Sequence, residues 1–115
     1  MMETVSNLSK TQPAALSQII PTETLKLLLK TFKEQKGEHF HLTALGYFGS
    51  YARGEARPDS DVDIVFQTDY PNLLVTVALQ LELTELLNRP VDILRYRPSL
   101  SPRLKARIDQ EAVYV

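Results

Sequence analysis

Three stretches of the chain carry apolar residues at the spacing of an α-helix, with polar residues on the opposite face. The first begins after Pro21 and ends near Gly37, which is placed to stop a helix. The second covers residues 73–87 and is mostly apolar. The third opens with Ser101 and Pro102, which suit the N-cap and first position of a helix.

Between these helices lie short apolar runs that are typical of β-strands, at residues 41–48, 61–66 and 91–96. The order of helix, strand, strand, helix, strand and helix predicts an α+β (mixed α/β) fold. In this fold a short mixed sheet carries helices packed mainly on one face. Residues 1–20 show no clear period, so we expect a tail or weak helix there and a single domain over residues 21–115.

Composition narrows the classes of function. The chain of 115 residues has a formal net charge of −1 and a pI near 6.1, so strong nucleic-acid binding is not expected. It has no cysteine, which excludes thiol nucleophiles and thiolate metal sites. Because no apolar run is long enough to span a membrane and the N-terminus lacks the apolar core of a signal peptide, we expect a cytoplasmic protein.

Two aspartates stand out in the segment from Gly49 to Ile64. Because side chains alternate along a strand, Asp61 and Asp63 should project from one face while Val62 and Ile64 enter the core on the other. Two carboxylates this close repel each other, and both remain ionised at low cost only beside a cation or in water. Carboxylate oxygens of this kind select Mg²⁺ or Mn²⁺.

A third carboxylate, Asp92, lies in the last predicted strand between Val91 and Ile93, which alternation sends to the other face. If this strand lies beside the second one, Asp92 joins Asp61 and Asp63. Three acids on one sheet face suit a two-metal site, in which one ion activates an attacking hydroxyl and the other holds a triphosphate.

A candidate phosphate-binding turn precedes these acids. Gly49 allows the backbone to approach a phosphate closely, and Ser50 offers a hydroxyl and a backbone N–H. Arg53 and Arg57 follow in the next loop, and spacing alone does not say which of them would neutralise phosphate charge.

Each feature has a simpler explanation when it is taken alone. A single Asp-x-Asp is usually a solvated strand edge or loop, Gly-Ser is a common turn, and Asp92 could instead pair with Arg89 or Arg95. The joint order of turn, loop, paired acids, helix and further acid is what favours a catalytic site.

These residues resemble a known family. Gly49-Ser50, ten further residues and then Asp61-Val-Asp63-Ile are similar to the signature of the DNA polymerase β-like nucleotidyltransferase superfamily. The Val-Asp-Ile around Asp92 and the closing Ile-Asp-Gln-Glu-Ala-Val-Tyr resemble its small branch, the minimal nucleotidyltransferases (MNT). The resemblance runs from about residue 24 to the end of the chain.

The resemblance implies a role for each candidate residue. Asp61 and Asp63 would ligate two Mg²⁺ ions, with Mn²⁺ as a possible substitute. Asp92 would complete the metal site and help to deprotonate the acceptor hydroxyl. Gly49 and Ser50 would hold the triphosphate of ATP, the nucleotide donor.

Members of this branch are commonly encoded beside an all-helical HEPN protein, which is a ribonuclease toxin. The MNT protein neutralises this toxin and can adenylylate it on a tyrosine. The resemblance therefore implies transfer of AMP to a partner HEPN toxin by an antitoxin. Two alternatives stay open. The chain could neutralise its partner by binding alone, or it could modify a small molecule, although its length leaves little room for the extra substrate-binding structure this would need.

Overall fold

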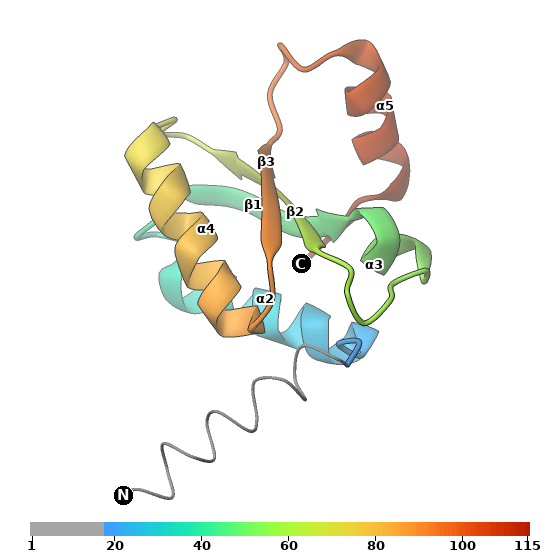
Figure 1. Ribbon diagram of the computed structural model, residues 1–115. Coiled ribbons are helices and arrows are strands. Elements are labelled where there is room, and N and C mark those ends of the chain that lie inside the picture. Colours follow the sequence, from blue (N-terminus) through green and yellow to red (C-terminus); the bar gives the residue numbers. More distant parts are fainter. Residues whose placement is uncertain (1–17) are drawn as a thin grey trace, which may run out of the picture.

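The structure is a computed structural model that describes residues 18–115. A four-stranded sheet forms its centre, and helices pack around it (Figure 1). In chain order, the elements are α2 Thr22–Lys36, β1 Leu42–Phe48, α3 Gly49–Arg53, β2 Val62–Thr68, α4 Leu73–Leu87, β3 Val91–Arg95, α5 Pro102–Glu111 and β4 Val113–Tyr114.

The three predicted helices and three predicted strands are all present, with ends shifted by no more than a few residues. The short helix α3 begins at the candidate phosphate-binding turn, and neither α3 nor the two-residue strand β4 is among the predicted elements. The predicted tail or weak helix over residues 1–20 lies mostly outside the described residues.

Local capping explains where α4 begins and ends and where α5 begins. The Asn72 side chain accepts a hydrogen bond from the backbone N–H of Val75 and caps α4, and Ser101 caps α5 in the same way. Asn88 ends α4 in the left-handed conformation, with φ of 54°. The chain therefore turns sharply into β3 directly after α4.

The sheet is mixed, as predicted, with strand order β3-β2-β1-β4. Strand β1 pairs antiparallel with β2 and with β4, whereas β2 and β3 run parallel. Parallel strands need a crossover connection, and α4 provides it. This connection brings the strand that holds Asp92 beside the strand that holds Asp63.

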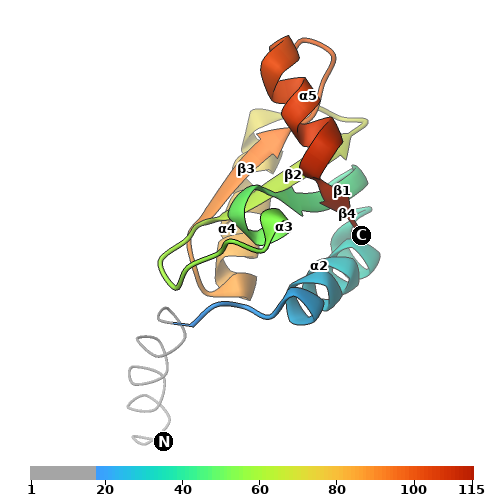
Figure 2. The ribbon, with the colours of Figure 1, turned by 90° about the vertical axis from the view of Figure 1, so that its right-hand side faces the viewer.

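The main core lies between the sheet and helices α2 and α4, where Leu29, Leu79 and Leu83 pack against Val62 and Ile64. A smaller cluster on the other face joins Phe48 and Val65 to Ile108 of α5. The partly buried side chains that pack against this cluster are Leu94, Tyr96, Leu104 and Ala112. Figure 2 shows α3 and α5 in front of the sheet and α4 behind it. Within residues 18–115, no helix is both long and apolar enough to cross a membrane.

Candidate active site

Asp63 and Asp92 are register partners across the parallel pair of β2 and β3. Partners in neighbouring parallel strands stand about 4.8 Å apart along the hydrogen-bonding direction and project to the same face. Val62 and Ile64, on either side of Asp63, are fully buried in the main core, as strand alternation predicts. The two aspartates therefore share the face that carries α5.

Asp61 lies one residue before β2 and is exposed, whereas Asp63 is half-buried. Burial raises the pKa of the Asp63 carboxyl, and the negative charges of Asp92 and Asp61 raise that pKa further. The positive charges of Arg107 and Arg53 act in the opposite direction. The other two acids of the predicted cluster thus both contribute to the electrostatic field at Asp63.

The donor set suits a hard divalent cation. Three carboxylates offer only oxygen ligands, and the raised pKa of Asp63 means that a cation would relieve the cost of ionising it. As the side chains stand, no three His, Cys, Asp or Glu residues among 18–115 are gathered closely enough to enclose an ion. Metal ligation by Asp61, Asp63 and Asp92 therefore stays a prediction.

Gly49 brings the candidate phosphate-binding turn against Asp63. Its φ of 71° lies in the left-handed region that favours glycine, and a methyl group at this position would overlap Oδ2 of Asp63. Ser50 follows as the second residue of α3 and is half-buried. The backbone of the turn and the acid cluster are thus in direct contact.

Sequence reasoning gave no role to Glu111, yet its carboxylate lies at the same turn. Oε1 accepts hydrogen bonds from the backbone N–H of Gly49 at 2.8 Å, from Nη1 of Arg53 at 3.2 Å and from Nε of Arg107 at 3.3 Å. Burial raises the pKa of Glu111, but the bond from Gly49 and the charges of Arg107 and Arg53 outweigh it and hold that pKa below its usual value.

The two loop arginines occupy different positions. Arg53 bonds both Glu111 and Glu55, the latter from Nε at 2.9 Å, and its charge acts on Asp63. Arg57 lies farther along the loop and is exposed, where its backbone N–H bonds the Ser60 hydroxyl. The geometry therefore places Arg53, rather than Arg57, at the turn.

A buried polar contact fixes α3 from the other side. The Tyr51 hydroxyl accepts a hydrogen bond from Nη1 of Arg89 at 3.0 Å and another from the backbone N–H of Ile20 at 3.3 Å. Arg89 is only 6% exposed. These hydrogen bonds connect the turn to Arg89, which precedes β3, and to Ile20, which precedes α2.

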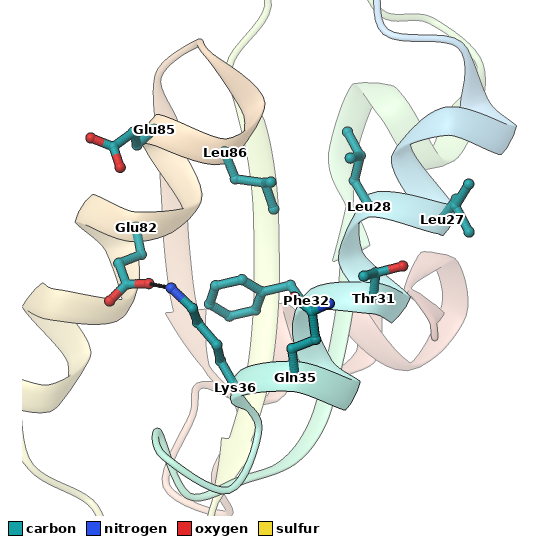
Figure 3. Close-up of a pocket in the computed structure, with 9 residues that line it drawn as sticks. All are labelled: Leu27, Leu28, Thr31, Phe32, Gln35, Lys36, Glu82, Glu85 and Leu86. Carbon is teal, nitrogen blue, oxygen red and sulfur yellow. Dashed lines mark hydrogen bonds and ion pairs between the residues drawn. The ribbon is translucent and has the colours of Figure 1, made fainter.

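A separate hollow of about 590 Å³ lies between α2 and α4, on the main-core side of the sheet. Figure 3 shows Lys36 of α2 reaching across it to bond Glu82 of α4, with Leu28 and Leu86 on its walls. None of the predicted site residues lines this hollow. The acids and the turn form a different, more polar surface.

A small mixed sheet with paired acids beside a Gly-Ser turn is the arrangement that the resemblance to the nucleotidyltransferases implied. A family model described as "Polymerase beta, Nucleotidyltransferase" matches residues 26–115, and the chain belongs to this family. It is 36% identical over 98 residues to the protein adenylyltransferase MntA of Thermococcus cleftensis, covering 84% of this chain and 98% of that protein.

Two solved structures resemble the fold. One, described as a "putative minimal nucleotidyltransferase", has 35% sequence identity and a TM-score of 0.70, covering 82% of this chain and 95% of that chain. The other is a chain from the complex of the tri-AMPylated Shewanella oneidensis HEPN toxin with its MNT antitoxin. It has 20% identity and a TM-score of 0.50, covering 75% of this chain and 71% of that one, so this likeness concerns the fold alone.

Proposed function

We propose that this nucleotidyltransferase transfers AMP from ATP to a hydroxyl group, a tyrosine hydroxyl of a partner HEPN toxin, and that it acts in the cytoplasm as the antitoxin of that partner. The observation that carries the chemistry is the register pair of Asp63 and Asp92, with the Gly49 turn packed against the Asp63 carboxylate. The name of the Thermococcus relative, a protein adenylyltransferase, supports a protein as acceptor.

Asp61, Asp63 and Asp92 are the residues that would hold two Mg²⁺ ions, and Mn²⁺ has the same preference for oxygen ligands. When bound, such ions lower the pKa of the attacking hydroxyl and neutralise charge on the leaving phosphates. In this proposal the hydroxyl and backbone N–H of Ser50, in α3, donate to the triphosphate, and the guanidinium of Arg53 adds positive charge at the same turn.

In the proposed step, the acceptor oxygen forms a bond to the α-phosphorus of ATP. The bond from that phosphorus to the oxygen bridging to the β-phosphate breaks, and pyrophosphate leaves. The proton of the acceptor hydroxyl passes to the Asp92 carboxylate. Because no covalent bond to the protein is needed, positioning and charge stabilisation should supply most of the rate.

The surface of α4 favours a protein partner. Helix α4 is apolar along most of its length, and part of its apolar surface faces solvent. Leu73, Leu74 and Leu81 are 78%, 80% and 65% exposed. Contiguous apolar side chains on a surface mark sites where other macromolecules bind. The same observation favours the second candidate function, in which binding alone neutralises the toxin.

Mass spectrometry of the partner tests the proposal. The proposal predicts that a HEPN protein is encoded beside this chain. That protein is incubated with the chain, Mg²⁺ and ATP, and is then weighed intact. We expect mass increments of AMP that disappear when Asp63→Asn replaces the wild type. Asp59→Asn, at an exposed turn before the acid pair, is a matched control that should transfer AMP normally.

An unmodified partner would contradict transfer. If Asp63→Asn still suppressed the ribonuclease activity of the partner in that case, neutralisation by binding would replace the enzymatic proposal. Peptide mapping of the modified protein then tests the finer prediction, because attachment to a residue other than tyrosine would refute the proposed acceptor group.

A further inference from the structure

Arg107, on α5, is fixed at the edge of the candidate active site. Its guanidinium carbon lies 5.9 Å from the centroid of the Phe48 ring, and its Nε donates to Oε1 of Glu111 at 3.3 Å. Phe48 is the register partner of Asp63 and directly precedes Gly49. Arg107 is therefore held over the end of β1, where the acid cluster and the turn meet.

Arg53 approaches the same carboxylate from α3. Its Nη1 lies 3.2 Å from Oε1 and 3.4 Å from Oε2 of Glu111. The positive charges of both arginines act on Asp63. Two guanidinium groups from helices far apart in the sequence thus flank one carboxylate beside the catalytic acids.

We propose that Arg107 binds the outer phosphates of the nucleotide together with Arg53, and that Glu111 is the positioning residue that directs both guanidinium groups toward the triphosphate. This inference rests on the proposed function, because it takes ATP as the donor and the Gly49–Ser50 turn as its phosphate site. It adds two residues of α5 to a site otherwise built from α3, β2 and β3.

The donor inventory permits this role. A guanidinium carries five N–H donors in a planar fork that matches phosphate oxygens. Within the described part of the chain, Arg107 engages Glu111 through Nε alone, and its side chain is 49% exposed. The remaining N–H groups of Arg107 are therefore available to a ligand that enters beside the turn.

Glu111 also explains why the two arginines can lie close together. Like charges repel, and an anionic carboxylate between them compensates that repulsion while the site holds no nucleotide. The bond from the Gly49 N–H fixes the carboxylate itself, at 2.8 Å. A purely structural role for this network predicts changes in stability when it is broken, but no change in the discrimination between nucleotides.

The test compares binding of ATP and AMP to the intact chain by isothermal titration calorimetry in the presence of Mg²⁺. Arg107→Gln should weaken ATP binding about 10- to 100-fold, as expected for a lost charge-assisted hydrogen bond, while AMP binding changes less than about twofold. Arg107→Lys should restore part of the affinity, because it keeps the charge and loses the fork. Arg103→Gln, an exposed residue one turn earlier on α5, is the matched control and should bind ATP normally.

Glu111→Gln keeps an acceptor for the Gly49 N–H and removes the charge that holds both arginines. We expect it to raise KM for ATP several-fold with little change in kcat, because ground-state and transition-state binding of the outer phosphates weaken together.

Wild-type ATP binding that survives unchanged in folded Arg107→Gln would overturn this inference alone. Equal losses for ATP and AMP would also overturn it, since the contact would then not be to the outer phosphates. A wild-type chain that binds no ATP would overturn both this inference and the proposed function.

Discussion

Asp63 and Asp92 stand as register partners on the only parallel strand pair of the described sheet. A short hairpin between β2 and β3 would make the two strands antiparallel. Their parallel pairing therefore requires the crossover through α4. Helix α4, which packs in the main core, therefore also determines which two acids meet on the opposite face.

The Asp63 carboxylate should destabilise the fold when no cation is present. Its native pKa is raised above 3.8, so the native state binds more protons than the unfolded state, and stability falls as pH rises through the raised pKa. Asp63→Asn is neutral at every pH. Chemical denaturation in a chelator should show this variant gaining stability relative to wild type between about pH 3 and pH 7.

Asp59→Asn also removes one carboxylate, but from an exposed turn, so it is the control for this series and should have a stability close to that of wild type. If the stability difference between Asp63→Asn and wild type were the same at both ends of the pH range, a pKa of Asp63 raised by burial and by the charges of Asp92 and Asp61 would not be its cause.

Gly49→Ala and Gly54→Ala form a second matched pair. Both glycines have φ of 71°, so each alanine pays the left-handed backbone cost of about 1–2 kcal/mol. An alanine methyl at Gly54 meets open space, whereas one at Gly49 overlaps the Asp63 carboxylate. We expect Gly49→Ala to unfold at lower denaturant concentration than Gly54→Ala and to lose AMP transfer, which Gly54→Ala retains. Equal stability and activity in the two variants would contradict close packing of the turn on Asp63.

Tyr51→Phe probes how α3 is anchored. The Tyr51 hydroxyl accepts hydrogen bonds from Arg89 and from the backbone of Ile20, and Arg89 is buried. Removal of the Tyr51 hydroxyl should lower the free energy of unfolding by about 1–2 kcal/mol, because the Arg89 side chain and the Ile20 N–H lose an acceptor. Urea denaturation measures this cost, and Tyr114→Phe, whose ring is 43% exposed, should change stability by less than about 0.5 kcal/mol.

Much of this architecture could be predicted from the sequence, because the spacing of apolar residues in a long helix or strand identifies that element from its own segment alone. The α4 and β3 boundaries are marked by Asn72 and Asn88, and Asp63 falls on an alternating strand. The remaining contacts depend on residues far apart in the sequence. Strand β4 has two residues and exists only because Gly46 pairs with Tyr114, and the bond from Gly49 to Glu111 spans 62 residues. No local pattern reports either contact.

The last prediction concerns metal and nucleotide. A ligand that binds only the native state adds RT ln(1 + [L]/Kd) to its stability, which is about 2.7 kcal/mol when the ligand is at one hundred times its Kd. Mg²⁺ with ATP should therefore raise the thermal midpoint of the wild type by several degrees, since about 1 kcal/mol shifts the Tm of a domain of this size by roughly 4 °C. Asp61→Asn and Asp63→Asn should lose this response even if they melt no lower than wild type without ligand, because each removes a carboxylate that is proposed to bind the metal. Ser50→Ala should retain part of the response, since its backbone N–H remains. Differential scanning fluorimetry with Mg²⁺ alone, ATP alone and both together separates the two ligands, and a response that survived intact in Asp63→Asn would place the ions outside the pair of Asp63 and Asp92.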